Sequence, residues 1–297
     1  KKTTNSNLQI HSNASGLFYL QIDIQGFFVS INKNILFNLI KKHVNNPKIL
    51  WLTQKIIFHN PTKNFKINGN LKLLKTIPEH KSLFNKKDRG LPIGNLTSQF
   101  FANVYLNELD QFVKHKLKCK NYFRYMDDML LIHSSPEKLS IWKKDIEKFL
   151  FKKLELKLHP KKQILKPVCQ GIDFCGYIIK PEYTLIRRRT VKKLKNKLWH
   201  FNQKILNYSK ASDKLKAEQI IFNDPFYLFD NPKIYKEFCH IFSSINSTYG
   251  FLKYANCWSL RKKLYKKHFG ILKIYLRPAN KNYDYFMWQD ENFFRES

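Results

Sequence analysis

Two apolar, β-prone segments that carry acidic residues constrain this 297-residue chain more than any other feature. Residues 17–24 read LFYLQIDI and contain Asp23 near their end, and residues 122–132 hold Asp127 and Asp128 between two short apolar runs. The first pattern predicts a buried strand, and the second predicts a hairpin with the acidic pair at its tip. Because an unpaired carboxylate beside buried apolar residues is costly, Asp23 needs a partner.

If these two strands are neighbours, the three carboxylates converge. Their mutual repulsion would then be relieved by hard divalent cations, which prefer oxygen ligands. Two such ions about 4 Å apart can activate an attacking oxygen and stabilise a leaving phosphate. The alternative is that Asp127 and Asp128 form an ordinary exposed acidic turn.

The charge of the chain favours a polyanionic partner. Its 54 Lys and Arg residues outnumber 22 Asp and Glu, which gives a net charge of +32, and such an imbalance destabilises a compact fold unless an anion is bound. Nucleic acid is the first partner class and an anionic membrane surface is the second. The sequence shows neither an 18-residue apolar run nor a signal peptide, so the membrane alternative has no support from these features. With 15% aromatic residues, intrinsic disorder is excluded.

Local patterns predict an α+β domain followed by a helical region. Asn32 is expected to cap a helix, residues 45–90 to be irregular, and residues 90–94 to form a loop before another helix. The remaining expected elements are a helix that begins at Ser135-Pro136, short strands around 171–179 and a helix that opens at Thr190. We place the domain boundary near residue 182, between domains 1–182 and 183–297.

Two basic runs lie in the second predicted domain. Residues 183–212 and residues 238–283 each hold nine Lys or Arg and no acid. Together they predict a surface that follows nucleic-acid phosphates, with a solvated helix face as the alternative for either run. The candidate backbone contacts are Arg187, Arg188, Arg189, Lys192 and Lys193. The five cysteines form neither a CxxC pair nor a zinc-type cluster, which predicts reduced thiols in a cytoplasm.

Five segments resemble the ordered motifs of reverse transcriptases. They are 20–31 (LQIDIQGFFVSI, motif A), 89–99 (RGLPIGNLTSQ, motif B), 125–128 (YMDD, motif C), 156–163 (motif D) and 171–177 (primer grip). The resemblance covers roughly residues 17–200. It implies a right-hand polymerase, with a palm built on a ferredoxin-like core in 1–182 and a basic helical thumb in 183–297. Only 22 residues precede Asp23, so we expect the fingers to be largely absent from this chain.

The wording of motif B narrows the resemblance. GLPIGNLTSQ followed by FANVYLNELD at 101–110, together with residues 246–264, is similar to the reverse transcriptases of diversity-generating retroelements. These bacterial and phage enzymes copy a template repeat with errors at template adenines. The alternative within the enzyme class is a retron, group II intron or phage-defence reverse transcriptase. Motif B of retron and group II intron enzymes usually reads QGxxxSP, and this sequence is absent here. The non-enzyme alternative is a basic RNA-binding module with an inactive palm.

The resemblance implies roles for the acidic residues and for one lysine. Asp23 and Asp127 would ligate two Mg²⁺ ions, for which Mn²⁺ could substitute, and the carbonyl of Ile24 would add an oxygen. Asp128 would lie nearby and bind metal in some states. Lys162 matches the motif D lysine that protonates the leaving pyrophosphate, and Lys161 is the neighbour that could substitute for it.

The resemblance also implies substrate contacts. Phe28 stands where an aromatic ring excludes a ribose 2′-OH, and the other nucleotide-binding candidates are Ile93, Gly94 and Gln99. The primer-grip candidates are Phe174, Gly176 and Tyr177. Core packing is the alternative for Phe28, Ile93 and Tyr177, and an ordinary turn is the alternative for Gly94.

The expected partners are those of a template-directed polymerase. They are template RNA, cDNA or a primer, and deoxynucleoside triphosphates, and the retroelement resemblance adds a basic accessory protein. The expected location is the cytoplasm of a bacterium, with the gene carried by the bacterium or a phage, and no membrane partner is expected.

Overall fold

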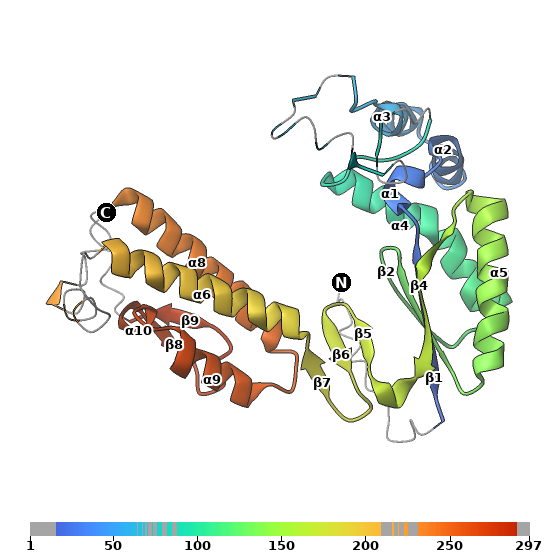
Figure 1. Cartoon of the computed structure of the whole chain (residues 1–297). Helices are drawn as coiled ribbons and strands as arrows, with labels where there is room; N and C mark the ends of the chain where they lie inside the picture. Colours follow the sequence, from blue (N-terminus) through green and yellow to red (C-terminus); the bar gives the residue numbers. More distant parts are fainter. Residues whose placement is uncertain are drawn as a thin grey trace. The chain divides into compact units, whose positions relative to one another are not determined.

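The computed structural model describes residues 16–63, 88–208 and 231–289 throughout, and some residues between 64 and 87 and between 209 and 230. The described chain divides into two compact units between Gln170 and Gly171 (Figure 1). The predicted boundary near residue 182 lies inside the second unit. The assignment of 1–182 and 183–297 as separate domains stays a prediction.

A four-stranded antiparallel sheet with the strand order β2-β3-β1-β4 organises the first unit (Figure 1). Its strands are β1 (Phe18–Ile24), β2 (Asn121–Tyr125), β3 (Asp128–His133) and β4 (Leu158–Pro167). The connection from β1 to the β2–β3 hairpin contains several helices, of which the last is the longest, and a single helix connects β3 to β4. The strands and these two long helices follow the βαββαβ order of ferredoxin-like domains. β1 therefore lies inside the sheet, hydrogen-bonded on both sides.

The two long helices are α4, the last α-helix between β1 and β2, and α5, which joins β3 to β4. α5 contacts β1, β3, β4 and α4, so both helices belong to one layer against the sheet (Figure 1). The helices of this unit are α1 (Phe27–Ser30), α2 (Lys33–Lys41), α3 (Pro47–Phe58), α4 (Leu96–Gln111) with a π-helical extension (Phe112–Lys116), α5 (Pro136–Leu154) and a 3₁₀ turn (Val168–Gln170).

The alternation of β1 separates a core face from a polar face. Leu20, Ile22 and Ile24 are buried in the hydrophobic core of this unit, and side chains along a strand alternate between faces. Gln21 and Asp23 therefore project from the opposite face of the sheet. This places the first acidic candidate away from the layer formed by α4 and α5.

Several sequence predictions for this unit are confirmed. The strand at 17–24 and the hairpin at 122–132 are present. Asn32 caps α2 by accepting hydrogen bonds from the backbone N–H groups of Asn34 and Ile35, and the Ser135 hydroxyl caps α5. In both helices a polar side chain accepts a hydrogen bond from a backbone N–H group of the first turn, which would otherwise lack a partner within the helix.

The expectation that residues 45–90 are irregular is wrong in its first part, because α3 occupies 47–58. The Asn46 side chain accepts hydrogen bonds from two backbone N–H groups, and Pro47 occupies the first turn. Ile57 is the buried residue of this helix, whereas Trp51 and Leu52 are exposed. Residues 49–52 are four consecutive apolar residues and spread around the whole helix, so the sequence marks no single apolar face of the kind by which a surface helix is recognised.

The second unit combines two small sheets with helices. Its hydrophobic core is built mainly from α6 and α8, which contact each other, together with α9 and the chain that follows it. The elements are β5 (Ile172–Phe174), β6 (Tyr177–Ile179), β7 (Thr184–Ile186), α6 (Arg188–Tyr208), α8 (Pro232–Leu252), α9 (Trp258–His268), α10 (Leu272–Tyr275), β8 (Leu276–Pro278) and β9 (Phe286–Trp288).

This unit is less purely helical than the sequence predicts. β7 extends the β5–β6 pair to three strands, and β8 pairs with β9. The helix expected from Thr190 begins at Arg188. In the described part of the chain, no helix combines the length and apolar character that a membrane crossing requires.

Candidate active site

The pairing of β1 with β3 brings two of the predicted acidic residues together. Asp23 and Asp128 are directly opposed in the register of these antiparallel strands, so their side chains share one face of the sheet. Asp127 precedes β3 in the hairpin turn, and its side chain is half-buried. The condition on which the convergence of the acids depended, that the two strands are neighbours, is met.

The pKa of the Asp127 carboxyl reflects its burial and the charges around it. Burial raises this pKa above its ordinary value, and the charge of Asp23 raises it further. A backbone hydrogen bond and the positive charge of Lys162 act in the opposite direction. A carboxyl group whose ionisation is opposed by burial and by a neighbouring carboxylate favours a nearby cation.

Lys162 supplies one such positive charge. Its ammonium donates a hydrogen bond to Asp23 Oδ2 at 2.5 Å. This bond is the main cause that raises the pKa of Lys162, and the charges of Asp23, Asp127 and Asp128 also raise it, against a lowering by burial. Lys162 therefore lies within the electrostatic reach of all three acids.

A bulge in β4 explains how a lysine reaches the end of β1. Ile22 pairs with Gln163 and Ile24 pairs with Leu158, so four residues of β4 stand opposite Asp23 alone. Such an irregularity re-aims side chains next to the strand that it faces. The bulged residues include both Lys161 and Lys162, and the structure records the contact with Asp23 for Lys162.

Gln21, which the sequence reasoning missed, binds Asp128. Its amide nitrogen donates to both carboxylate oxygens, at 3.0 and 3.2 Å. Gln21 and Asp23 are two residues apart on β1, so they lie on the same face of the sheet. Asp128 is thus held by a neutral donor while Asp23 is held by an ammonium. The signal for Gln21 was a polar residue inside an otherwise apolar strand, on the side of the acid.

Arg124 was also missed, although it lies three residues before Asp127. Its guanidinium makes two hydrogen bonds to the Asp110 carboxylate of α4, at 2.8 and 2.5 Å. A third donor binds the carbonyl oxygen of Met126 at 3.0 Å. The signal was a charged residue in a strand whose other residues are mainly apolar or aromatic.

The predicted nucleotide-binding residues lie in the same unit as the acids. Phe28 is half-buried in α1 and packs against the core, and its carbonyl accepts a hydrogen bond from Leu91 N–H at 2.8 Å. This bond ties α1 to the loop that carries Ile93 and Gly94. Ile93 is 77% exposed, so it is available to a ligand, whereas Phe28 combines a core contact with partial exposure.

Gly94 and Gln99 lie on either side of the start of α4. Gly94 has φ +103°, a conformation that L side chains rarely adopt, and no atom would crowd an added Cβ there. The backbone conformation therefore favours glycine at position 94, whereas close packing does not require it. Gln99 is exposed in the first turns of α4.

The predicted primer-grip residues belong to the second unit. Tyr177 stacks on Phe251 with ring centroids 4.3 Å apart and donates its hydroxyl hydrogen to the Phe251 carbonyl. A Cβ at Gly176 would lie 2.5 Å from the Phe251 ring, and Phe174 is buried. Packing within the unit explains these three residues at least as well as primer contact does.

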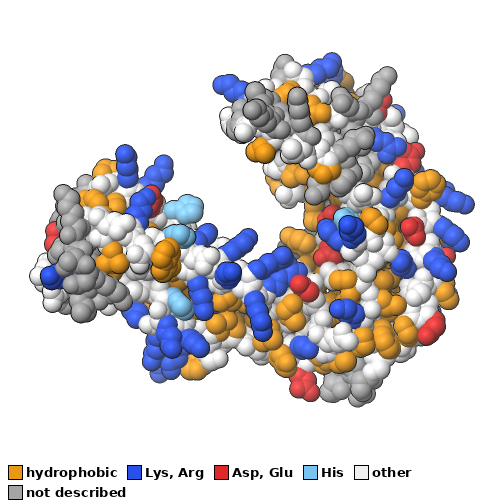
Figure 2. Space-filling view, viewed as in Figure 1, with side chains coloured by type: hydrophobic (Ala, Val, Ile, Leu, Met, Phe, Trp, Pro, Cys, Tyr) orange, Lys and Arg blue, Asp and Glu red, His pale blue; other side chains and the backbone are white. Residues whose placement is uncertain are grey.

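The predicted phosphate contacts are also in the second unit. Arg188, Arg189, Lys192 and Lys193 are exposed in the first turns of α6, and Lys and Arg side chains gather over this helix (Figure 2). Arg187 differs, because it is largely buried and forms an ion pair with Asp173. The four exposed residues suit phosphate binding, whereas Arg187 has a partner within its own unit.

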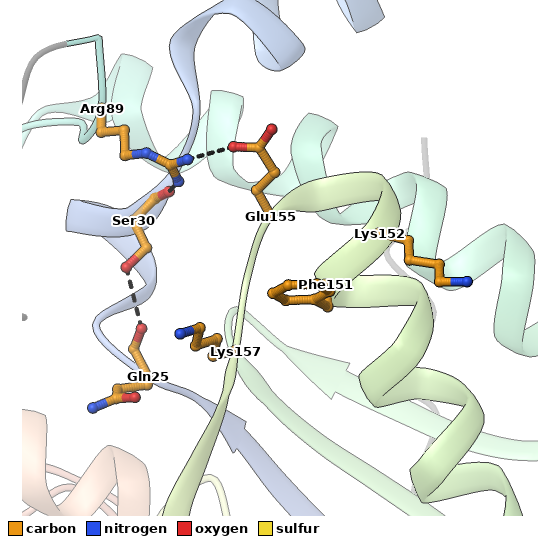
Figure 3. Close-up of a pocket in the computed structure, with 7 residues that line it drawn as sticks. All are labelled: Gln25, Ser30, Arg89, Phe151, Lys152, Glu155 and Lys157. Carbon is orange, nitrogen blue, oxygen red and sulfur yellow. Dashed lines mark hydrogen bonds and ion pairs between the residues drawn. The ribbon is translucent and has the colours of Figure 1, made fainter.

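The first unit has a cavity of about 730 Å³, lined by residues that include Ser30 of α1 and Phe151 of α5 (Figure 3). Arg89 bridges its wall by donating to the Ser30 carbonyl and forming an ion pair with Glu155. Lys152 points away from the cavity, and the Phe151 ring faces it (Figure 3). The candidate acids are not among its lining residues, so this cavity is separate from the acidic site.

A family model described as "Reverse transcriptase (RNA-dependent DNA polymerase)" matches residues 1–179, more than half of the chain. The chain belongs to the reverse transcriptase family. The match includes β1, α4, the β2–β3 hairpin and β4, and so covers each element that carries an acidic, lysine or nucleotide-binding candidate. A comparison with curated proteins finds no match.

Among solved structures, telomerases share a limited likeness with this member of the family. The telomerase of Candida albicans bound to a fragment of telomeric RNA is 15% identical, with a TM-score of 0.36 over 87% of this chain and 44% of its own. The apo telomerase of Candida tropicalis is 15% identical, with a TM-score of 0.39 over 95% of this chain and 48% of its own. The chain thus spans a little under half the length of these telomerases.

Proposed function

We propose that this chain is the catalytic part of an RNA-directed DNA polymerase. The observation that carries the proposal is the opposition of Asp23 and Asp128 across β1 and β3, with Asp127 beside them and Lys162 on Asp23. Paired carboxylates at the end of a buried strand suit nucleotidyl transfer, which needs charge stabilised on phosphate oxygens. In this proposal the first unit is the palm and the second unit contributes the thumb.

The acidic residues fit a hard divalent cation such as Mg²⁺, with Mn²⁺ as a substitute. Within the described residues, no group of three or more His, Cys, Asp or Glu side chains is arranged so that it could hold a metal ion by itself. Mg²⁺ nevertheless binds through one or two carboxylates and takes its other oxygens from water and substrate phosphates. Asp23 and Asp127 would hold the ions, with the Ile24 carbonyl as a further oxygen. Bound ions would help to deprotonate the primer 3′-OH and stabilise the departing pyrophosphate.

The other residues have distinct tasks in this proposal. Lys162 holds a proton on its ammonium beside Asp23, where it can be given to the leaving pyrophosphate. Gln21 fixes Asp128 in one orientation. The half-buried ring of Phe28 would contact the sugar and exclude a 2′-OH. The exposed basic residues of α6 would bind the phosphates of template and primer.

We further propose that the enzyme serves a diversity-generating retroelement. The support is the wording of motif B, in which Ile93 stands at a position where retroviral enzymes carry Gln, and its exposure of 77%. Apolar contact discriminates poorly between similar ligands, whereas hydrogen bonding discriminates strongly. An aliphatic side chain beside the nascent base pair would thus permit errors at template adenines. A basic accessory protein and a bacterial or phage setting belong to this proposal.

Asp127→Asn tests the catalytic assignment. The substitution keeps the size of the side chain and removes one negative charge, so it should abolish primer extension on an RNA template and weaken Mn²⁺ binding measured by electron paramagnetic resonance. RNA affinity, measured by fluorescence anisotropy, should stay at the wild-type value. Asp145→Asn on α5 is the matched control, and it should leave extension and Mn²⁺ binding unchanged.

Two results would count against the proposal. Extension by Asp127→Asn at the wild-type rate would remove the acidic site from the reaction. A wild-type chain that extends no primer on RNA or DNA with either Mg²⁺ or Mn²⁺ would refute the polymerase function itself.

A further inference from the structure

The guanidinium of Arg124 makes four hydrogen bonds beside the turn that contains Met126 and Asp127. The exposed fractions of the Arg124 and Asp110 side chains are 11% and 20%. Asp110 also accepts a hydrogen bond from the Tyr122 hydroxyl at 2.9 Å. A guanidinium that binds a carboxylate through two of its nitrogens is fixed in both position and plane. The head of Arg124 is thus anchored on α4, outside the strand that carries it.

The group that this anchored arginine holds is the peptide before Asp127. Arg124 Nη1 donates to the Met126 carbonyl oxygen at 3.0 Å. Met126 has φ +55°, a left-handed conformation that is unfavourable for a residue with a side chain. Such a conformation persists only when surrounding contacts determine it. Since Met126 and Asp127 share a peptide bond, the orientation of that carbonyl fixes where the Asp127 backbone begins.

A second residue of α4 reaches the same turn. Asn103 Oδ1 accepts a hydrogen bond from Arg124 Nη1 at 3.2 Å, and its amide nitrogen lies 3.9 Å from the Met126 sulfur. The same amide nitrogen donates to the Gln99 carbonyl oxygen at 3.2 Å. Polar contacts therefore run from the first turns of α4, where the nucleotide-binding candidate Gln99 lies, to the turn that holds Asp127.

We propose that Arg124, anchored by Asp110 and steadied by Asn103, is a positioning residue that holds the Met126–Asp127 turn in the geometry that catalysis requires. Arg124 touches neither substrate nor reacting atoms in this role. It acts on the carboxylate through the backbone, as residues that orient metal ligands do. The inference rests on the proposed polymerase function, because the geometry of this turn matters for the reaction only if Asp127 is catalytic.

Arg124→Lys in the full chain is the direct test. Lysine keeps the positive charge but cannot bind Asp110 through two nitrogens and reach the Met126 carbonyl as well. We expect kcat for primer extension to fall about 10- to 100-fold, and the Mg²⁺ concentration for half-maximal rate to rise by a similar factor. The KM for deoxynucleotide and the affinity for RNA should not change.

The matched control is Arg261→Lys in the second unit. Arg261 forms an ion pair with Asp284 at 2.5 Å, and the exposed fractions of the two side chains are 8% and 16%. It is thus a largely buried arginine–carboxylate pair outside the site, bonded through one guanidinium nitrogen. Its variant should lower the melting temperature about as much as Arg124→Lys does and leave the Mg²⁺ dependence unchanged.

Asn103→Ala keeps the test decisive if Arg124→Lys does not fold. Asn103 is exposed, so the fold should tolerate alanine, and the loss of one hydrogen bond should lower kcat about 2- to 10-fold. Asn107→Ala is its control, because Asn107 is an exposed asparagine one helical turn later on α4. We expect Asn107→Ala to match the wild type.

The outcomes separate the two proposals. If the wild type extends primers and both Arg124→Lys and Asn103→Ala behave like their controls, the positioning role is refuted and the polymerase function stands. If the wild type has no polymerase activity, the proposed function fails first. A shift in the Mg²⁺ requirement for Arg124→Lys but not for Arg261→Lys supports the positioning role.

Discussion

Replacing Lys162 with methionine should change metal affinity and reaction rate in opposite directions. Methionine keeps much of the length of the side chain and removes the ammonium that binds Asp23. Without that ammonium, the Asp23 carboxylate is released to a divalent cation, so Mg²⁺ should bind more tightly. The proton that Lys162 would give to pyrophosphate is lost at the same time, so the chemical step should slow.

The exposure of the ion pair sets the size of the change in Mg²⁺ affinity, and the loss of the general acid sets the size of the change in rate. Lys162 is 59% exposed and Asp23 is 16% exposed, so the pair is screened by solvent and contributes about 0.2–1 kcal/mol. Since about 1.4 kcal/mol changes an equilibrium tenfold, half-saturation should need about 1.5- to 5-fold less Mg²⁺. Loss of a general acid costs about 10²–10⁴ in rate, so kcat should fall far more than metal affinity rises.

Two assays resolve these effects. Single-turnover extension over a range of Mg²⁺ concentrations gives the rate and the apparent affinity, and titration with Mn²⁺ followed by electron paramagnetic resonance gives metal binding without turnover. Lys161→Met is the matched control, because Lys161 is the adjacent exposed lysine in the same bulge. A Lys162→Met variant that behaves like Lys161→Met in both assays would refute the reasoning for both the ion pair and the acid.

Two further substitutions test the error mechanism and the backbone of α5. Ile93→Gln should lower misincorporation opposite template adenine more than opposite other bases, as measured by sequencing cDNA from both proteins on one RNA template, and equal adenine error rates would remove Ile93 from the mechanism. Glu155, at the C-terminal cap of α5, has φ +51°. Glu155→Gly should be more stable than Glu155→Ala by about 1 kcal/mol, because only glycine avoids the left-handed cost. Equal urea-unfolding midpoints for the two variants would contradict this.

Local sequence patterns predicted the elements that carry their own signals. The strand at 17–24 has an uninterrupted β-prone run, and the helices that begin after Asn32 and Ser135 have caps that bind their first backbone N–H groups. Helix α3 escaped prediction because its apolar residues, which include the consecutive residues 49–52, spread around the helix and mark no single face. The short strand β7 escaped because its pairing partner, and not its own composition, determines that it is a strand.

The site was predictable where residues are neighbours along the chain or belong to a motif. Asp23, Asp127 and Asp128 could be expected together once two strands were assumed to pair. The contacts of Gln21 and Arg124 could not be, because they depend on register and on a helix that begins elsewhere in the chain. The β4 bulge, which selects Lys162 over Lys161 for the contact with Asp23, is likewise invisible without the register.

The central place of β1 ties the assembly of this site to the order in which the chain is made. The contact between Gln21 and Asp128 spans 107 residues, and the contact between Lys162 and Asp23 spans 139. On the ribosome, β1 must wait for β3 and then for β4, and until β4 pairs it the apolar strand keeps one open edge. Open edges recruit strands from other chains. A chain that ends between β3 and β4 should therefore aggregate, and Lys162 can reach Asp23 only when β4, the last strand, closes the sheet.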